Sequence, residues 1–294
     1  MISIGKQELI GDSRTFITIP ESIIINSIMD SKRVAAYTFF WVWSGKNNKL
    51  MHSVESVVSW CKFVPNYHAG KINDSFIELI NQLQSIGYIS CNDDISIKPH
   101  TRMITTQLNN DWYEGIADRN ERFARIYLDE IQKIMDYDCG TKSKSLTNSN
   151  ILLVFAYLRL KIIVRNNIEG ETPENIKRSP EVFYGYYKDI SSELGINERT
   201  LSSIFQILSD LELIHLTHIR KPVVDSNGNQ KWITFPTLFC NVYKRLGGFL
   251  IYDGKDYYEQ ETKNKIKTMN FDGIKKKKAK IEETETNMEW IDLM

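Results

Sequence analysis

This sequence of 294 residues lacks the short motifs that mark many nucleotide-binding enzymes and zinc proteins. Neither of the glycine-rich phosphate-binding patterns, GxxxxGK and GxGxxG, occurs in it. No two of its four cysteines form a CxxC pair, and its five histidines and four cysteines have no spacing that suits a zinc ion. We therefore expect a protein without a catalytic site, a bound metal ion or a cofactor.

Long apolar runs are also missing. The most apolar stretch, residues 151–164, contains Arg159 and Lys161 and is too short and too charged to span a membrane. Residues 1–14 lack the basic-then-apolar layout of a secretory signal. Because the four cysteines also suggest no disulfide framework, these features predict a cytoplasmic protein that does not contact a membrane.

The chain has no excess of charge of either sign. Lysine plus arginine number 37, aspartate plus glutamate number 37, and the formal net charge is zero. Because affinity for nucleic acid depends mainly on contacts to phosphate, any DNA-binding surface must be local. Charge is uneven near the end, where residues 261–280 contain eight lysines and two acids, and residues 281–294 contain five acids and no basic residue.

The clearest local pattern lies in the second half of the chain. A short helix is expected at 189–194 and, after a turn at Gly195, a longer helix at 198–211. A strand is expected at 214–219, and 231–235 has the pattern of the returning strand of a hairpin. The apolar residues of the longer helix are spaced by three and four and form one stripe: Leu201, Ile204, Phe205, Leu208 and Leu211.

The first half shows the same order of elements. A helix is expected at 32–43, and Ser53 is suited to cap a short helix that follows it. A longer helix is expected at 71–86, with strands at 88–91 and 95–97. The order of helix, short helix, turn, long helix, strand, turn and strand therefore occurs twice.

Three further elements complete the prediction. Residues 16–20 have the pattern of a strand that ends at a proline, and residues 149–164 that of a strong helix. Another helix is expected between the two halves. Its apolar face consists of Phe123, Ile126, Tyr127, Ile131 and Ile134.

Residues 187–219, YKDISSELGINERTLSSIFQILSDLELIHLTHI, resemble the winged helix-turn-helix superfamily. Ile190 and Leu194 match the packing positions of the first helix of that motif. Gly195 matches the tight turn, which needs a positive φ, and Asn197 matches the cap of the second helix. In this superfamily the second helix lies in the major groove and the wing contacts the neighbouring DNA backbone.

Residues 53–97 resemble the same superfamily through the stretch LQSIGYI at 83–89, which leads from the second helix into the first wing strand. The turn before that helix, residues 64–70, is longer than is usual in the superfamily. The resemblance implies a mostly α fold with small β-wings (α+β), in tandem winged-helix domains. The predicted parts are an N-terminal winged-helix domain at 1–98, a helical connector at 99–147, a C-terminal winged-helix domain at 148–260 and a charged, disordered tail at 261–294.

The resemblance also implies which residues contact DNA. Arg199 can read guanine through its two-pronged donor geometry or hold a phosphate. From Lys188 to Lys231, however, five basic residues face six acidic ones, so a module that binds protein remains an alternative. The predicted DNA-binding residues are Asn197, Arg199, Thr200, Ser202, Ser203, His218, Arg220, Lys221 and Lys231 in the second domain, and Asn66, Tyr67, His68, Lys71, Asn73 and Ser75 in the first.

The tail contains two further candidates. Lys275, Lys276, Lys277, Lys278 and Lys280 can neutralise phosphates, and the alternative is a solubilising tail. Residues 288–294 combine apolar and acidic side chains and can dock as a short peptide, with the alternative of an ordinary disordered end. The predicted anchors for such docking on a host replication protein are Trp290, Ile291 and Leu293.

The arrangement as a whole resembles replication initiators of plasmids and phages from low-GC Gram-positive bacteria. This resemblance implies a non-enzymatic protein that binds double-stranded DNA at a replication origin and recruits host replication factors. A transcriptional regulator with the same fold and an interaction adaptor that binds no DNA are the alternatives. The oligomeric state stays open, with a homodimer as one option.

Overall fold

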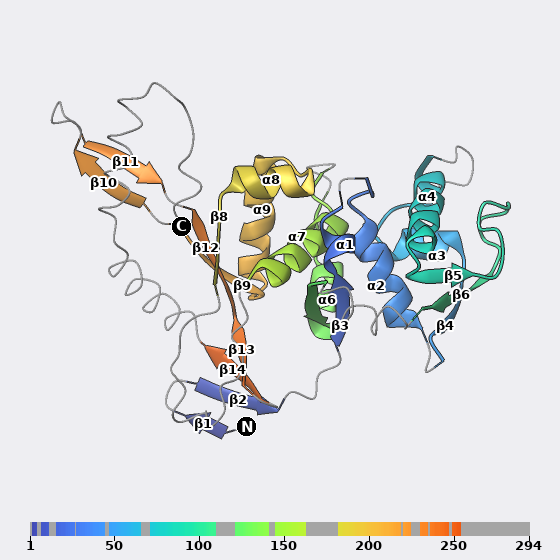
Figure 1. Cartoon of the computed structure of the whole chain (residues 1–294), viewed down its shortest axis with the longest axis horizontal. Helices are drawn as coiled ribbons and strands as arrows, with labels where there is room; N and C mark the ends of the chain where they lie inside the picture. The colour runs from blue at the N-terminus through green and yellow to red at the C-terminus, as the bar shows by residue number, and fades with distance from the viewer. Residues whose placement is uncertain are drawn as a thin grey trace.

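A computed structural model of the chain describes residues 2–4, 7–11, 16–26, 28–44, 47–65, 71–109, 121–140, 145–162, 182–218, 220–224, 230–234, 236–246 and 249–253. This described part is a mixed α+β fold in which eight helices combine with small antiparallel sheets (Figure 1). Within it, no helix is long and apolar enough to cross a membrane.

Most helices lie where the sequence pattern predicts them. The helices expected at 32–43, 71–86 and 198–211 are present as α2, α4 and α9. Ser53 caps α3 as predicted, since its Oγ accepts the backbone N–H of Ser56 at 3.2 Å. The eight helices are α1 (Glu21–Ile24), α2 (Arg33–Trp43), α3 (Val54–Trp60), α4 (Lys71–Ser85), α6 (Leu128–Asp136), α7 (Asn148–Lys161), α8 (Tyr187–Leu194) and α9 (Glu198–Asp210).

The strands of the described residues form five antiparallel sheets, in the orders β1-β2-β14-β13, β3-β7, β4-β6-β5, β8-β12-β9 and β10-β11. The strand expected at 16–20 is present as β3. The strands are β1 (Ile2–Ile4), β2 (Gln7–Gly11), β3 (Phe16–Pro20), β4 (Lys49–His52), β5 (Ile89–Cys91), β6 (Ile104–Leu108), β7 (Phe123–Tyr127), β8 (Val182–Gly185), β9 (Ile214–Thr217), β10 (Arg220–Val224), β11 (Gln230–Thr234), β12 (Thr237–Asn241), β13 (Tyr243–Leu246) and β14 (Phe249–Asp253).

Two parts of the chain share one arrangement, and we call them the first unit (residues 33–108) and the second unit (residues 148–241). Each consists of a helix, a strand, two helices and two strands, with the third strand between the first and the second. The first unit is α2, β4, α3, α4, β5, β6, and the second is α7, β8, α8, α9, β9, β12. The sequence patterns miss β4 and β8, because four residues are too few for a clear alternation.

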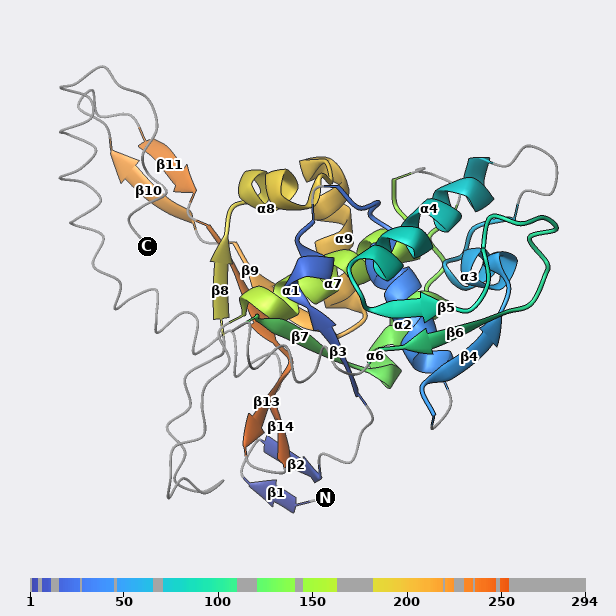
Figure 2. The same cartoon turned by 45° about the vertical axis from the view of Figure 1, so that its right-hand side comes forward.

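A hairpin is inserted between β9 and β12 of the second unit. Its strands β10 and β11 pair antiparallel, and both views show it extending away from the helices (Figures 1 and 2). The strand expected at 231–235 is present as β11. The partner of β9 is the following strand, β12, in which all five residues are buried.

The prediction of a strand at 95–97 is wrong. Residues 92–103 form turns and bends, and the returning strand is β6, which pairs with β5. The carboxylate of Asp94 accepts both the backbone N–H and the hydroxyl of Ser96, at 2.8 and 2.6 Å. Such a local turn competes with an extended backbone.

The prediction of a single helix around residues 123–134 is also wrong. Residues 123–127 form strand β7, and α6 begins only at Leu128. In β7, Ala124 and Ile126 are buried while Phe123 is 40% exposed, an alternation typical of strands. The partner of β7 is β3, about a hundred residues earlier in the chain. This distant pairing decides the conformation in a way that local apolar spacing cannot reveal.

Helix α7 lies at the centre of the core. Every residue from Ile151 to Leu160 is buried, and the helix packs against α1, α2, α6, α9 and β7. Buried residues of both units belong to one hydrophobic cluster around it. The domain boundaries at residues 98, 147 and 260 stay a prediction.

A buried ion pair joins α7 to its surroundings. Arg159 of α7 donates through Nη2 to Glu130 of α6 at 2.5 Å and through Nη1 to Asn241 of β12 at 2.7 Å. The other carboxylate oxygen of Glu130 accepts the backbone N–H of Tyr127 at 3.0 Å. Three elements that are distant in sequence therefore meet at one guanidinium group.

We expect Glu130→Gln to destabilise the fold, because it leaves the buried charge of Arg159 without its counter-ion. The expected loss in the free energy of unfolding is about 3–5 kcal/mol, measured by urea denaturation. The exposed Glu78→Gln is the matched control, with an expected change within about 0.5 kcal/mol. Equal effects of the two variants would show that the ion pair does not support the fold.

His52, at the end of β4, is a buried imidazole in the first unit. It is 2% exposed, its ring lies 5.1 Å from that of Phe40, and its Nε2 lies 2.7 Å from the hydroxyl of Thr106. Burial lowers the pKa of His52 below its ordinary value, and a hydrogen bond to the carbonyl of Ser53 opposes this shift. The folded chain therefore favours the neutral ring.

Stability should consequently fall with acidification. The unfolded chain binds a proton at His52 below about pH 6.5, whereas the folded chain resists that proton until a lower pH. The free energy of unfolding should therefore decrease as the pH falls from about 7 toward the folded pKa. Denaturation curves of His52→Gln should lack this part of the decrease. Parallel pH dependences of the variant and the original chain would contradict the prediction.

Candidate nucleic-acid interface

Helix α9 is held firmly by its apolar stripe. Leu201, Ile204, Phe205 and Leu208 are fully buried, as the spacing predicts, and Leu211 is half-buried. The ring of Phe205 lies 4.7 Å from that of Phe239 in β12 and 4.9 Å from that of Tyr187 in α8. The helix therefore has a defined inner side and leaves its opposite side to solvent. The two predicted packing positions of the preceding helix agree, since Ile190 and Leu194 are buried, and Ile196 of the turn is buried as well.

The turn before α9 has the predicted geometry. Gly195 adopts a φ of 67°, a left-handed conformation that glycine reaches without strain. The side chain of Asn197 accepts the backbone N–H of Arg199 at 2.9 Å and so caps α9. These two residues set the direction in which the helix leaves the turn.

The outer side of α9 is polar and accessible. Asn197, Arg199, Ser202 and Ser203 are exposed, as expected for a groove-facing surface, and the hydroxyl of Ser203 donates to the carbonyl of Arg199 at 3.3 Å. Thr200 is half-buried, and its hydroxyl lies 3.2 Å from that of Ser145. It is therefore less available than the prediction assumed.

The prediction missed one residue of this face. Gln206 is exposed, and its amide donates to Asp210 at 2.7 Å. It follows Ser202 and Ser203 by four and three residues, a spacing that places side chains on one side of a helix. That spacing would have revealed it in the sequence. Acidic residues also lie on the helix, with Glu198 and Asp210 exposed at its two ends.

The inserted hairpin contains the predicted basic wing residues. Along its two strands Arg220 pairs with Thr234, Lys221 with Ile233, and Val223 with Lys231. His218 precedes the hairpin and is exposed. Its Nδ1 lies 3.1 Å from the hydroxyl of Thr237, and its ring lies 6.0 Å from that of Tyr187, so it is held at the base of the hairpin.

Among the described residues, the predicted DNA contacts of the first unit are less accessible than those of α9. Asn73 was expected to face a groove, but it is 1% exposed and its amide nitrogen lies 3.2 Å from Nδ1 of His100. His100 belongs to the loop between β5 and β6, so this loop contacts α4 at Asn73. Ser75 is half-buried and donates to the carbonyl of Ile72 at 2.7 Å, whereas Lys71 is exposed.

The exposed side of α4 contains two acidic residues besides Lys71. Asp74 and Glu78 are exposed there, and they line a shallow cavity of about 540 Å³ together with Asn81, Lys98 and His100. The carboxylates of Asp74 and Glu78 repel a phosphate backbone. On α9, the corresponding side of the helix presents the cation Arg199. The two long helices occupy equivalent places in their units but offer different surfaces.

Several predicted contacts lie outside the described residues, namely Asn66, Tyr67, His68, Lys275, Lys276, Lys277, Lys278, Lys280, Trp290, Ile291 and Leu293. Within the described ranges, no group of three or more histidine, cysteine or acidic side chains is placed to hold a metal ion. All four cysteines are free thiols, and burial raises the pKa of the Cys61 thiol above its ordinary value.

Removing the cap of α9 should cost stability. Asn197→Ala leaves the backbone N–H of Arg199 without its side-chain acceptor, and the expected loss is about 1 kcal/mol in the free energy of unfolding. The exposed Ser202→Ala, inside the same helix, serves as the control and should change stability by less than about 0.5 kcal/mol. A result in which the two variants unfold alike would mean that the cap does not contribute.

The chain was compared with known proteins by sequence and by structure. No family model matches it, and no curated protein or solved structure matches it either. The surfaces of α9, the inserted hairpin and α4 are therefore the basis for assigning a function.

Proposed function

We propose that both units are winged-helix modules and that the second one binds double-stranded DNA. The shared order of helices and strands supports the first part of this proposal, together with the resemblance of residues 187–219 to that superfamily. In such modules the second helix of the motif enters the major groove. In the second unit, that helix is α9.

The observation that carries the proposal is the accessible polar side of α9, fixed from behind by a fully buried apolar stripe. The major groove is about 12 Å wide and admits one α-helix. A helix that enters the groove must be fixed rigidly to the core on one side and uncovered on the other. Helix α9 meets both requirements, since Phe205 is fully buried and Arg199, Ser202 and Ser203 are exposed.

Each group on this side has a chemical role in the proposal. Arg199 donates to a guanine edge or to a phosphate. Ser202 and Ser203 donate to phosphates, and the amide of Gln206 reads an adenine edge. The basic residues of the hairpin neutralise the neighbouring phosphates, which supplies the local positive charge that a chain of zero net charge needs.

We assign DNA contact to the second unit and not to α4 of the first. Asp74 and Glu78 lie within the exposed side of α4 and repel phosphates, whereas the exposed acids of α9, Glu198 and Asp210, lie at its two ends. The buried Asn73 is not available to a base. This difference favours a role in protein contact for the first unit. Such a division fits an initiator that holds an origin with one module and recruits replication factors with the other.

We therefore propose a replication initiator or origin-binding protein of a plasmid or phage. The same surfaces suit a transcriptional regulator, and deletion of the gene separates the two roles. Loss of replication of the element indicates an initiator, and altered transcription with an unchanged copy number indicates a regulator. An adaptor that binds no DNA would show no salt-dependent retention on duplex DNA.

The DNA-binding proposal is tested with Arg199→Ala. A target is first selected from a random pool of duplexes, and its Kd is then measured at two salt concentrations. We expect a loss of about 1–3 kcal/mol in binding free energy, with relaxed preference at one position if Arg199 reads a base. If it holds a phosphate, the slope of log K against log salt should fall by about one.

Lys71→Ala removes an exposed lysine from α4 and is the matched control, because it changes the same net charge on the other unit. Its Kd should stay within about twofold of the original value. Equal weakening by both variants would contradict the assignment to the second unit. Unchanged binding of Arg199→Ala would remove α9 from the interface.

A further inference from the structure

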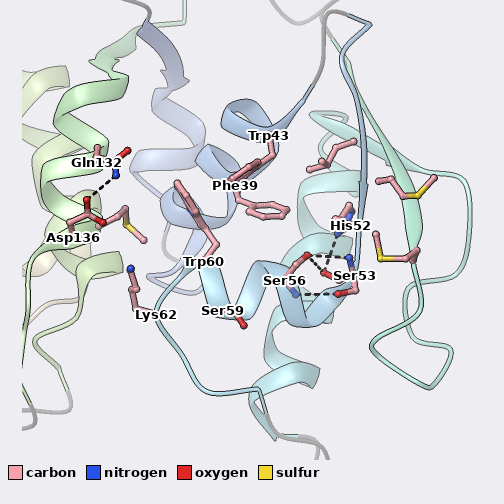
Figure 3. A pocket seen from close by; sticks show the side chains of 14 residues that line it. Phe39, Trp43, His52, Ser53, Ser56, Ser59, Trp60, Lys62, Gln132 and Asp136 are labelled. Atoms are coloured by element: carbon pink, nitrogen blue, oxygen red, sulfur yellow. Dashed lines mark hydrogen bonds between the residues drawn. The ribbon is translucent and has the colours of Figure 1, made fainter.

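A second hollow lies between the first unit and α6, where it is bordered by α2, β4, α3 and α6 (Figure 3). It has a volume of about 550 Å³, which is within the range of pockets that bury small ligands or anchoring side chains. Most of its lining surface is apolar and consists of aromatic rings and methionines. The apolar lining includes Phe39, Trp43, Met51, Trp60, Met103 and Met135, and seven of the fourteen lining residues are polar or charged.

This pocket is open to solvent at its apolar edges. Trp43, Met51 and Met103 are 56%, 66% and 54% exposed. Large apolar side chains gathered around one hollow mark a binding surface, whereas isolated ones are ordinary on a protein surface. Three methionines in the lining adapt readily to the shape of a bound side chain.

The rim of the pocket contains one available positive charge. Lys62 is exposed at the end of α3, and no ion pair of it occurs among the described residues. Figure 3 shows it near Asp136 and Gln132, on the side of Trp60 away from His52. Asp136 accepts the amide of Gln132 at 2.8 Å, and no ion pair between Asp136 and Lys62 occurs among the described residues. An acidic group beside an apolar anchor would therefore find its counter-charge at Lys62.

We propose that this pocket binds residues 288–294 of the same chain, with the sequence MEWIDLM. Five of these seven residues are apolar, and they match the lining of the pocket. Trp290 fills the hollow beside Trp60, and Glu289 or Asp292 meets Lys62. This site is separate from the DNA-binding surface, and the proposal does not depend on it.

The chain is long enough for this contact. Between Asp253, the last described residue, and Met288 there are 35 steps of backbone. A chain of that length spans up to about 120 Å. A compact protein of this size has a radius of gyration of only about 19 Å. The segment can therefore reach the pocket from any point on the surface.

Binding within one molecule also removes the need for high affinity. The local concentration of a tethered segment is on the order of millimolar, so a peptide that binds only moderately still occupies the site most of the time. The exposed apolar edges would be covered in the full chain.

The test measures how readily Met51 and Met103 are oxidised in the full chain. Dilute hydrogen peroxide converts accessible methionine to its sulfoxide, and mass spectrometry reports the rate at each residue. We expect Trp290→Ala to speed oxidation of both methionines by about tenfold, because the anchor no longer covers them. Asn287→Ala lies just outside the segment and should leave both rates unchanged.

A charge exchange tests the pairing itself. Lys62→Glu should speed oxidation of Met51 and Met103, and a chain with both Lys62→Glu and Glu289→Lys should oxidise more slowly than the single variant. Lys49→Glu is the control, since Lys49 is exposed but does not line the pocket. All of these changes are at exposed or tail positions, so unfolding curves should confirm an intact fold.

Two results would overturn the proposal. Equal oxidation rates in the original chain and in Trp290→Ala would show that residues 288–294 do not cover the pocket. Protection that disappears on dilution would show that the segment comes from a second copy and not from the same molecule. Protection that is independent of protein concentration and lost with Trp290 supports the proposal.

Discussion

The structure depends on the burial of α7, in which every residue from Ile151 to Leu160 is buried. Such a helix must be surrounded, and the elements around α7 come from both units, from the connection between them and from α1, which precedes the first unit. Arg159 further restricts which elements can surround α7, because a buried guanidinium must be paired and hydrogen-bonded. Its partners Glu130 and Asn241 place α6 and β12 against the helix. Strand β12 in turn lies between β8 and β9 and packs Phe239 against α9. The residues that hold the proposed DNA-binding helix in place are thus linked to the centre of the core.

One arrangement of elements occurs twice in the chain, but its two copies offer different chemistry. In the second unit the long helix exposes Arg199 and hydroxyl groups, and an inserted hairpin adds three basic residues. In the first unit the corresponding helix exposes Asp74 and Glu78, and Asn73 is buried and contacts His100 of the loop between β5 and β6. The fold alone therefore does not determine what each copy binds. The side chains on the outer face of each long helix decide it.

The proposed DNA-binding surface and the apolar pocket lie on different elements. The proposed DNA contact involves α9 and the hairpin of the second unit, whereas the apolar pocket lies among α2, β4, α3 and α6. A chain without net charge can bind DNA only through such local surfaces, because it has no overall attraction to phosphate. The apolar pocket, by contrast, needs a matching apolar partner, and the chain itself contains one at residues 288–294.

The sequence by itself determined the features that depend on neighbouring residues. Apolar residues three and four apart placed α4 and α9, Ser53 and Asn197 capped α3 and α9, and Gly195 formed the turn. These interactions act within one or two helical turns, so they can be read locally. Only the tertiary structure decided that residues 123–127 pair with β3 as a strand, that the returning strand begins at Ile104, and that Asn73 is buried. Each of these outcomes depends on a partner far away in the sequence, and no local pattern contains that partner.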